Sequence, residues 1–402
     1  MNILDPTAAA TAASARAHAD RDSVVALTQN LVRIPTRGGI DSYNAAIDHL
    51  TGWMDDHDLA PQVLRDTSGS AVAVTAHIQG HHPGPTWVLD ACLDTAPFGD
   101  EDAWHHPPTS ATLDDGWLWG RGAADSKVAV AIFCHLASHL HQQRHTLNGQ
   151  VVVLFDLDEH TGGFAGARRY FDALDTPTDI GGVMIGYPGM DHVVVGGRGV
   201  HRARLHVHGV ASHSGASRPT PSAITKASEL VTALHQAPLP GPANGFAAGK
   251  VTVTAINGGQ GFSVVPDLCT INIDARTTPA FDDAHAAQTI ADVVAKVDTD
   301  WPDTPPTLVE AHTRWPPYAL SDDAPLRAAL TTAATHQGLD PVAKIAGPSN
   351  IGNYLAGLGI PATAGFGPHY EGLHATDERV LVDTIPTVQA VYELALHYLT
   401  HS

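Results

Sequence analysis

The pattern of apolar and polar residues predicts alternating helices and strands in the first half of the chain. Apolar residues recur at helical spacing over 22–35 and 126–143, whereas 71–78, 86–93 and 149–159 contain short, nearly continuous apolar runs. Spacing of three to four residues predicts amphipathic helices, and short apolar runs predict strands that are buried on both faces. This order of elements predicts a largely parallel sheet covered by helices.

The pattern changes near residue 194. Residues 202–210 and 251–276 alternate apolar and polar positions, and helical spacing returns over 222–237 and 278–297. Alternation with a period of two predicts antiparallel strands with one exposed face. We therefore predict an α/β protein with a mixed, largely parallel sheet and helices on both faces in residues 1–193 and 312–402, and an inserted α+β domain with a four-stranded antiparallel sheet in residues 194–311.

Composition narrows the possible partners. The chain has 402 residues and a formal net charge of −20, which argues against nucleic acid or an anionic membrane as its main partner. No segment approaches the roughly 20 apolar residues that a membrane span needs. The alanine-rich residues 1–22 are expected to form a frayed or helical leader rather than a signal peptide. Three widely spaced cysteines indicate no disulfide framework, so a reducing, cytoplasmic setting is expected.

Four stretches combine turn-forming residues with acids or histidines: ACLDTAP (91–97), GRGAADSK (120–127), DLDEHTGG (156–163) and GFGPHYEGLHATDE (365–378). Ligand sites in open α/β sheets lie beyond the carboxyl ends of the strands, where two of these stretches fall. An Asp and two His from separate loops are sufficient to hold a divalent metal. Most of the 26 histidines, among them His105 and His106, carry no motif and are assigned no function.

The same stretches carry a resemblance to a known family. Together with ASHSG (211–215) and INGG…VVPD…DAR (256–276), they resemble the motifs of the dinuclear-zinc aminoacylase and carboxypeptidase family of metallopeptidases. That family includes acetylornithine deacetylase, succinyl-diaminopimelate desuccinylase and glutamate carboxypeptidase. The resemblance covers nearly the whole chain. It implies a catalytic metal-binding domain, an inserted dimerisation or lid domain, and a pair of metal ions bridged by an aspartate.

The resemblance also implies roles for single residues. Asp125 matches the bridging aspartate and His374 the last ligand histidine. Glu159 matches the general base that takes a proton from water. Asp94 matches the residue that orients the first ligand histidine in the family.

Three ligand positions depart from the family pattern: Cys92 replaces the first histidine, His160 replaces the second glutamate of the acidic pair, and Tyr187 replaces the glutamate of a Gly-Glu-Pro turn. In the family, the first histidine and that turn glutamate bind one metal with the bridging aspartate. The other position keeps Asp125, His160 and His374. Because two dications about 3.5 Å apart repel by roughly 19 kcal/mol at an effective dielectric near 20, losing two carboxylates disfavours a second ion. We therefore predict one divalent metal per subunit, zinc or manganese.

Further residues match substrate contacts of the family. His213 matches a histidine of the inserted domain that reaches the active site of the partner subunit and supports the oxyanion, which implies a homodimer. Arg276 and Asn257 match residues that contact substrate, the arginine commonly through a carboxylate. Asn350 stands where many relatives have an aspartate and is expected to alter a substrate contact, and Tyr187 is expected to face the substrate or to pack.

These residues predict a metallohydrolase that cleaves a C–N bond in a small carboxylate-bearing substrate such as an N-acyl amino acid or dipeptide. Three alternatives stay open: a hydrolytic deaminase of an aromatic amine, a metal-free acyl transferase with Cys92 as nucleophile, and a relative that binds small molecules without turnover. Cys92 itself could fill space, bind metal or act as a reactive thiol. Cys134 and Cys269 are expected to be buried apolar residues.

Overall fold

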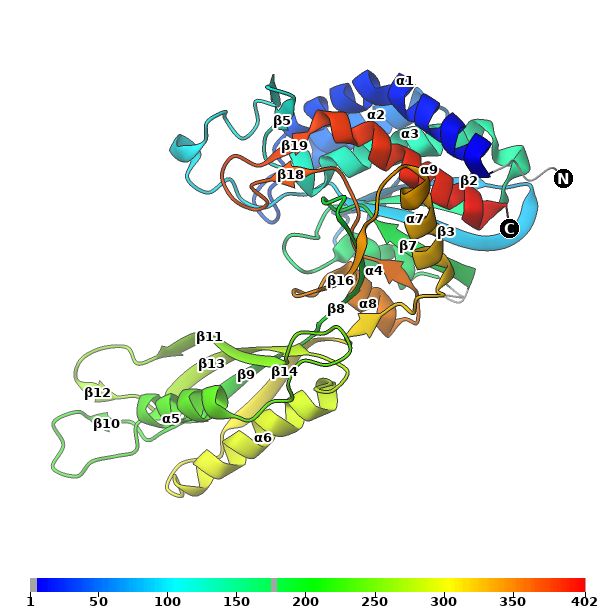
Figure 1. Cartoon of the computed structure of the whole chain (residues 1–402). Coiled ribbons are helices and arrows are strands. Elements are labelled where there is room, and N and C mark those ends of the chain that lie inside the picture. The colour runs from blue at the N-terminus through cyan, green and yellow to red at the C-terminus, as the bar shows by residue number, and fades with distance from the viewer. Residues whose placement is uncertain (1–5, 175–178, 402) are drawn as a thin grey trace. The chain divides into compact units, whose positions relative to one another are not determined.

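Figure 1 shows the computed structural model, which describes residues 6–174 and 179–401. The chain divides into two compact units. Unit 1 comprises Met1–Gly196, Leu320–Lys344 and Asn350–Ser402, and unit 2 comprises Gly197–Ala319 and Ile345–Ser349. Among the described residues, no helix combines the length and the apolar character needed to cross a membrane.

Unit 1 is built on a mixed six-stranded sheet, as the apolar runs predict. In spatial order its strands are β1 (Gln62–Arg65), β2 (Ala71–Gln79), β6 (Asn148–Asp156), β3 (His82–Cys92), β7 (Ile180–Ile185) and β17 (Ala362–Thr363). The pairs β1–β2 and β2–β6 are antiparallel, whereas β6–β3, β3–β7 and β7–β17 are parallel. Residues 151–155 of β6 are completely buried because layers of helices cover both faces of the sheet.

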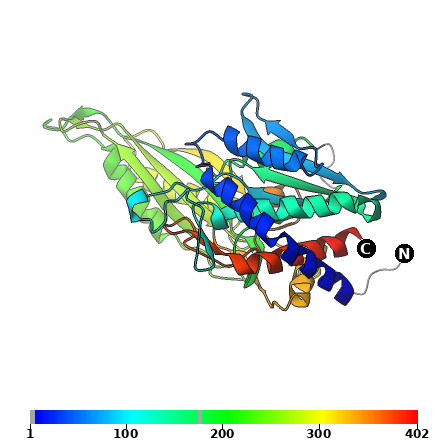
Figure 2. The same ribbon diagram turned by 90° about the horizontal axis from the view of Figure 1, so that it is seen from above.

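The helices of unit 1 are α1 (Pro6–Arg33), α2 (Asn44–Asp55), α3 (Val128–Gln142), α4 (Ala165–Phe171), α7 (Pro325–His336), α8 (Ile351–Gly357) and α9 (Ile385–Thr400). Helices α3 and α9 lie on one side of the sheet, and α4 and α8 lie on the other (Figure 1). Helix α1 packs across α3 and α9, as Figure 2 shows from above. The alanine-rich N-terminal segment is part of this packing, because Ala13 and Ala17 are buried against Ala390 of α9.

A smaller antiparallel sheet of unit 1 has the spatial order β18 (Tyr370–Glu371), β19 (Arg379–Leu381), β5 (Trp117–Trp119) and β4 (Thr112–Asp114). It brings the stretch after residue 365 beside the stretch before residue 120, although the two are far apart in sequence. Strands β8 (His192–Gly197), β15 (Tyr318–Ala319) and β16 (Val342–Ala346) lie where the chain passes from one unit to the other.

Unit 2 contains the predicted four-stranded antiparallel sheet. Its spatial order is β11 (Lys250–Gly258), β13 (Leu268–Thr277), β9 (Gly199–His208) and β14 (Leu308–Trp315), and β10 (Ser212–His213) pairs with β12 (Val264–Val265). Helices α5 (Ala223–Gln236) and α6 (Asp283–Thr299) pack on the sheet through a core that includes Leu205, Leu230, Ile271 and Ile290. The alternation in the sequence follows from this arrangement, since alternate strand residues point into that core. The predicted fold class is confirmed for both sheets.

Candidate metal centre and active site

The end of β3 supplies the first polar groups of the site. Strands β3 and β6 are parallel neighbours with Cys92 opposite Asp156, so the loops after both strands begin at one edge of the sheet. The buried Asp94 carboxylate accepts hydrogen bonds from the backbone N–H groups of Glu159 (3.1 Å) and His160 (2.9 Å). Asp94 therefore fixes the loop that carries Glu159 and His160, and its Oδ2 lies 3.5 Å from His160 Nδ1.

A second buried carboxylate, Glu378, fixes the loop that leads into α3. Its Oε1 accepts hydrogen bonds from the backbone N–H groups of Gly122 (3.0 Å), Ala124 (3.0 Å) and Asp125 (3.1 Å), and its Oε2 accepts one from the Arg121 guanidinium (2.6 Å). Burial raises the pKa of Glu378 and Arg121 opposes that shift. Four hydrogen-bond donors surround the two oxygens of Glu378, which fits a charged carboxylate. In a protonated acid, the O–H group would point at one of these donors instead of accepting from it.

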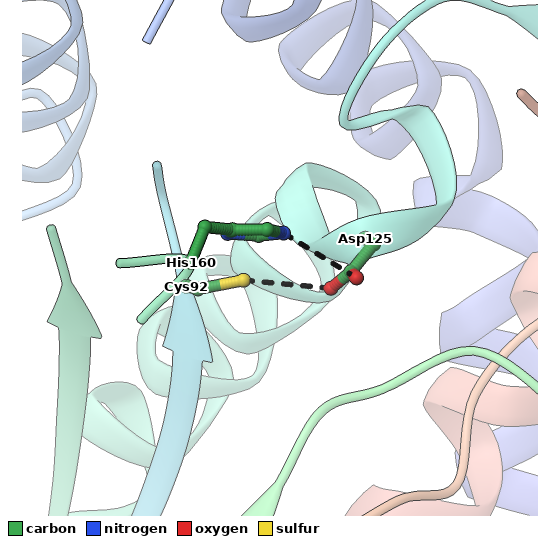
Figure 3. Close-up of side chains that lie close together, drawn as sticks. All are labelled: Cys92, Asp125 and His160. Atoms are coloured by element: carbon green, nitrogen blue, oxygen red, sulfur yellow. Dashed lines mark hydrogen bonds and ion pairs between the residues drawn. The ribbon is translucent and has the colours of Figure 1, made fainter. Parts of the chain in front are cut away.

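The two fixed loops and the end of β3 bring Cys92, Asp125 and His160 together, and we call these three residues the inner cluster (Figure 3). One ligand atom from each lies within 4.8 Å of the others. Asp125 is central: its Oδ1 lies 3.5 Å from Cys92 Sγ and its Oδ2 lies 3.5 Å from His160 Nε2. His374 Nε2 also lies 2.8 Å from Asp125 Oδ2, so all four predicted metal ligands meet at one carboxylate.

The electrostatics of the inner cluster favour a positive charge. Burial disfavours the His160 cation, but the facing carboxylates of Asp125 and Asp94 outweigh burial and raise the pKa of His160. Burial likewise opposes the charge of Asp125, yet His160 and His374 hold the pKa of Asp125 below its usual value. Burial, with the Asp125 charge, raises the pKa of the Cys92 thiol, so the free thiol stays protonated.

The His160 ring supports metal binding at the inner cluster. Both of its ring nitrogens are buried and have no hydrogen-bond partner among residues 6–174 and 179–401. Buried polar atoms rarely stay unpaired. A histidine, a carboxylate and a thiol together form a donor set that suits zinc and similar divalent ions. The inner cluster and His374 therefore fit a divalent metal.

Glu159 lies at the edge of the inner cluster. Its Oε2 is 3.6 Å from His160 Nδ1, and its side chain is 25% exposed. Burial is the main cause that raises the pKa of Glu159 to about 8, with further contributions from the charges of Asp125 and Asp94. A carboxyl group with a pKa this close to neutrality can both accept and return a proton.

Tyr187 and Asn350 also belong to unit 1. Tyr187 is half-buried, and burial followed by the negative charges of Asp125 and Glu159 raises the pKa of its phenol, so the group is neutral. Asn350 caps α8, because its side-chain oxygen accepts a hydrogen bond from the backbone N–H of Gly352 (2.9 Å). The structure thus gives Asn350 a role at the helix end, and its predicted substrate contact stays a prediction.

The remaining predicted residues belong to unit 2. His213 is exposed on β10, where its Nδ1 accepts a hydrogen bond from the backbone N–H of Gly215 (3.0 Å). Asn257 is exposed on β11. The Arg276 guanidinium forms an ion pair with Asp274, in which Nε lies 2.7 Å from Oδ1. Sequence analysis had assigned no role to Asp274 or to Glu378, because each acts through a partner that only the folded chain reveals.

Comparison with known proteins identifies the family. Residues 88–398 match the model of Peptidase family M20/M25/M40, which is well over half of the chain. The chain belongs to this family. The family that the sequence motifs indicated is therefore confirmed. The protein is a hydrolase of the M20 metallopeptidase family.

Individual proteins that resemble the chain in sequence or structure support its assignment to the M20 family. Succinyl-diaminopimelate desuccinylase of Psychrobacter arcticus is 27% identical over 328 residues, which cover 76% of this chain and 76% of that protein. The aminopeptidase PepT of Bacillus cereus has a TM-score of 0.74 and 18% identity, over 94% of this chain and 98% of that chain. The YXEP protein of Bacillus subtilis, described as a dinuclear metal-binding peptidase, has a TM-score of 0.70 and 17% identity, over 94% and 98%. The structural likenesses show the shared M20 fold.

Proposed function

We propose that this M20-family hydrolase cleaves an amide-like C–N bond in a small carboxylate-bearing substrate, such as an N-acyl amino acid or a dipeptide. The observation that carries the proposal is the position of Glu159, a proton acceptor whose Oε2 lies 3.6 Å from Nδ1 of the His160 ring. A proton acceptor beside a metal-binding donor set is the arrangement that hydrolysis by activated water requires.

One divalent ion, zinc or manganese, would be held by Asp125, His160 and His374, with the Cys92 sulfur as a further donor. When bound, such an ion supplies Lewis acidity that acidifies water and polarises the scissile carbonyl. The Bacillus subtilis relative is described as dinuclear. We propose a single ion here because Asp125 is the only carboxylate among these four donors, which leaves the charge of a second dication uncompensated.

Different residues of the chain would transfer the proton, hold the proton acceptor in place and bind the substrate. Glu159 accepts a proton from the attacking water and returns it to the leaving nitrogen. Asp94 holds the Glu159 backbone in place through the hydrogen bond that it already forms. Tyr187, neutral because burial raises the pKa of its phenol, can donate to a substrate oxygen without adding charge.

Substrate recognition and assembly are the finer parts of the proposal. Arg276 and Asn257 would contact the substrate carboxylate, and His213 of the partner subunit would support the oxyanion. A homodimer agrees with the apolar side chains that unit 2 exposes near β10–β12 and α5: Ile224, Ile256, Phe262, Val264 and Leu268. The three free, buried cysteines are consistent with the reducing cytoplasm.

The alternatives receive unequal support. A Cys92 nucleophile needs an accessible thiolate, but burial and the neighbouring Asp125 charge raise the pKa of this thiol. Hydrolytic deamination of an aromatic amine would use the same donors and the same base. A binding protein without turnover would leave Glu159 without a function, although Glu159 has the position and the raised pKa of a proton acceptor.

The test is Glu159→Gln, which keeps the shape of the side chain and removes the proton acceptor. Turnover of N-acyl amino acids and dipeptides should fall by about 10²–10⁴-fold, the usual contribution of a general base. In a His106→Ala background, which removes a donor of a second possible metal group, metal content per subunit should stay at one, as measured by elemental analysis. Glu371→Gln, at an exposed glutamate, is the matched control. Turnover equal to that of the control would refute the assignment of Glu159, and two ions per subunit in the His106→Ala background would refute the single-ion site.

A further inference from the structure

A second group of metal-type donors lies on the surface of unit 1. His105, His106 and Asp114 each offer one ligand atom, and these atoms lie within 4.8 Å of one another. His106 Nε2 is 3.3 Å from Asp114 Oδ2. We propose that these three residues, here called the peripheral cluster, bind a divalent transition-metal ion in addition to any ion at the inner cluster.

The peripheral cluster rests on an aromatic support. The Trp119 ring lies beneath both imidazoles, with centroid distances of 5.6 Å to His105 and 5.0 Å to His106. The two imidazoles meet edge to face with their centroids 4.7 Å apart. The Arg379 guanidinium stacks on the same indole at 4.1 Å from its centroid. Packed rings restrict rotation, so less conformational entropy is lost when a metal fixes the imidazoles.

The backbone around the cluster is fixed at two points. The β4–β5 hairpin pairs Leu113 with Leu118 and ends at Trp119, so Asp114 is carried by the same element as the supporting indole. The backbone N–H of His105 donates a hydrogen bond to Asp377 Oδ1 (2.7 Å). The two histidines and the aspartate thus approach each other from separate segments that are each tied to the sheet of β18, β19, β5 and β4.

The donor set selects the class of ion. Two imidazole nitrogens and one carboxylate suit Zn²⁺, Ni²⁺ and Cu²⁺, whereas Ca²⁺ and Mg²⁺ prefer shells of oxygen. The side chains of His106 and Asp114 are 22% and 54% exposed, so water can complete the coordination and the ion can exchange. The net charge of −20 also favours a cation at the surface.

Nickel titration of the full chain tests the proposal. Asp125→Asn removes the central donor of the inner cluster, so remaining tight Ni²⁺ binding reports on the peripheral cluster. We expect this variant to bind one Ni²⁺ per chain in calorimetry. Adding His106→Ala should weaken that binding by about tenfold or more, since even the residues that support a ligand contribute 10–100-fold. Adding His81→Ala, at another exposed histidine, should leave it unchanged.

Fluorescence gives a second readout that does not depend on the Asp125→Asn variant or on catalysis. Open-shell Ni²⁺ quenches nearby indoles, so binding should quench tryptophan fluorescence in the otherwise native chain. The quenching should be smaller in Trp119→Phe and in His106→Ala. His106→Ala should hydrolyse substrate as the native chain does. Equal Ni²⁺ affinity and equal quenching with and without His106 would overturn the proposal, as would equal loss in His106→Ala and His81→Ala.

Discussion

The inner and peripheral clusters of unit 1 each offer three donors, but they differ in what surrounds those donors. Side chains of the inner cluster are almost completely buried, with exposures of 4% for His160 and 1% for Asp125. Those of the peripheral cluster reach 22% for His106 and 54% for Asp114. Charges therefore interact strongly at the buried inner cluster, whereas water screens them at the exposed peripheral cluster.

Support differs between the clusters as well. Behind the inner cluster, Asp94 and Glu378 together accept five backbone N–H hydrogen bonds from the loops that carry its residues. The peripheral cluster is supported by tilted and edge-to-face contacts with Trp119 and by one hydrogen bond to Asp377. Buried carboxylates that bind backbone amides hold donors more rigidly than such ring contacts do. Catalysis needs that rigidity, whereas reversible ion binding does not.

Removing the support of the inner cluster is the change with the largest expected effect. Glu378→Gln leaves the buried Arg121 guanidinium without its counter-ion, although Arg121 keeps its hydrogen bond to the Ala375 carbonyl (2.9 Å). Losing one partner of a buried pair costs about 3–5 kcal/mol of unfolding free energy. Urea denaturation should show a loss of that size. Turnover should fall because the single oxygen of the substituted amide cannot accept both the Arg121 hydrogen bond and the three bonds from the Asp125 loop.

The matched control is Glu371→Gln. Glu371 pairs with Arg379 at the surface, and its side chain is 50% exposed. An exposed ion pair contributes about 0–1 kcal/mol, so this variant should unfold almost as the native chain does. Equal destabilisation by the two variants would show that Glu378 supports the site no more than a surface residue does.

Replacing Cys92 tests whether its sulfur is one of the metal donors of the inner cluster. If its sulfur binds metal, Cys92→Ala should weaken binding at the inner cluster by about 10–100-fold. Metal affinity is measured by competition with a chelator, in the His106→Ala background so that the peripheral cluster does not contribute. Cys134→Ala is the control, because Cys134 is equally buried but lies in the core of α3. Unchanged affinity in Cys92→Ala would assign Cys92 to packing alone.

Much of the inner cluster could be predicted because its signals are local. The apolar runs of β3 and β6 end at Cys92 and Asp156, and strand ends are where parallel sheets present polar residues. The role of Glu378 could not be predicted, since its partners at 121–125 lie more than 250 positions earlier in the sequence. A local pattern contains no information about such a long-range contact.

The peripheral cluster was missed for a related reason. His105 and His106 carry no motif, and their third donor, Asp114, is supplied by a hairpin whose place beneath them depends on pairing with β19. Asn350 stays a predicted substrate contact, and its side-chain oxygen also accepts the bond from the Gly352 backbone N–H that asparagine favours at a helix start.

His139 gives the smallest of the predicted effects and extends the comparison to a third histidine. Its side chain is 19% exposed, close to the 22% of His106, but it lies among three helices, whereas His106 lies in the loop before β4. Its Nε2 is 3.2 Å from Asp20 Oδ2 on α1. Its Nδ1 is 3.9 Å from Glu393 Oε2 on α9, which is too far for a hydrogen bond, so Glu393 acts through its charge.

The Asp20 hydrogen bond, with the nearby Glu393 carboxylate, raises the pKa of His139 from 6.5 to about 9. Because the pKa in the folded chain exceeds the unfolded value, the stabilisation is complete below about pH 6.5 and is lost as the pH rises through about 9. Allowing for solvent screening, this stabilisation should amount to about 1–2 kcal/mol.

His139→Gln should therefore lower the free energy of unfolding by about 1–2 kcal/mol at about pH 6 and by much less at about pH 9.5. Urea denaturation at both values measures the difference, with His145→Gln at an exposed histidine as control. A loss that is the same at both pH values would show that His139 stabilises the three-helix contact by packing and not by charge.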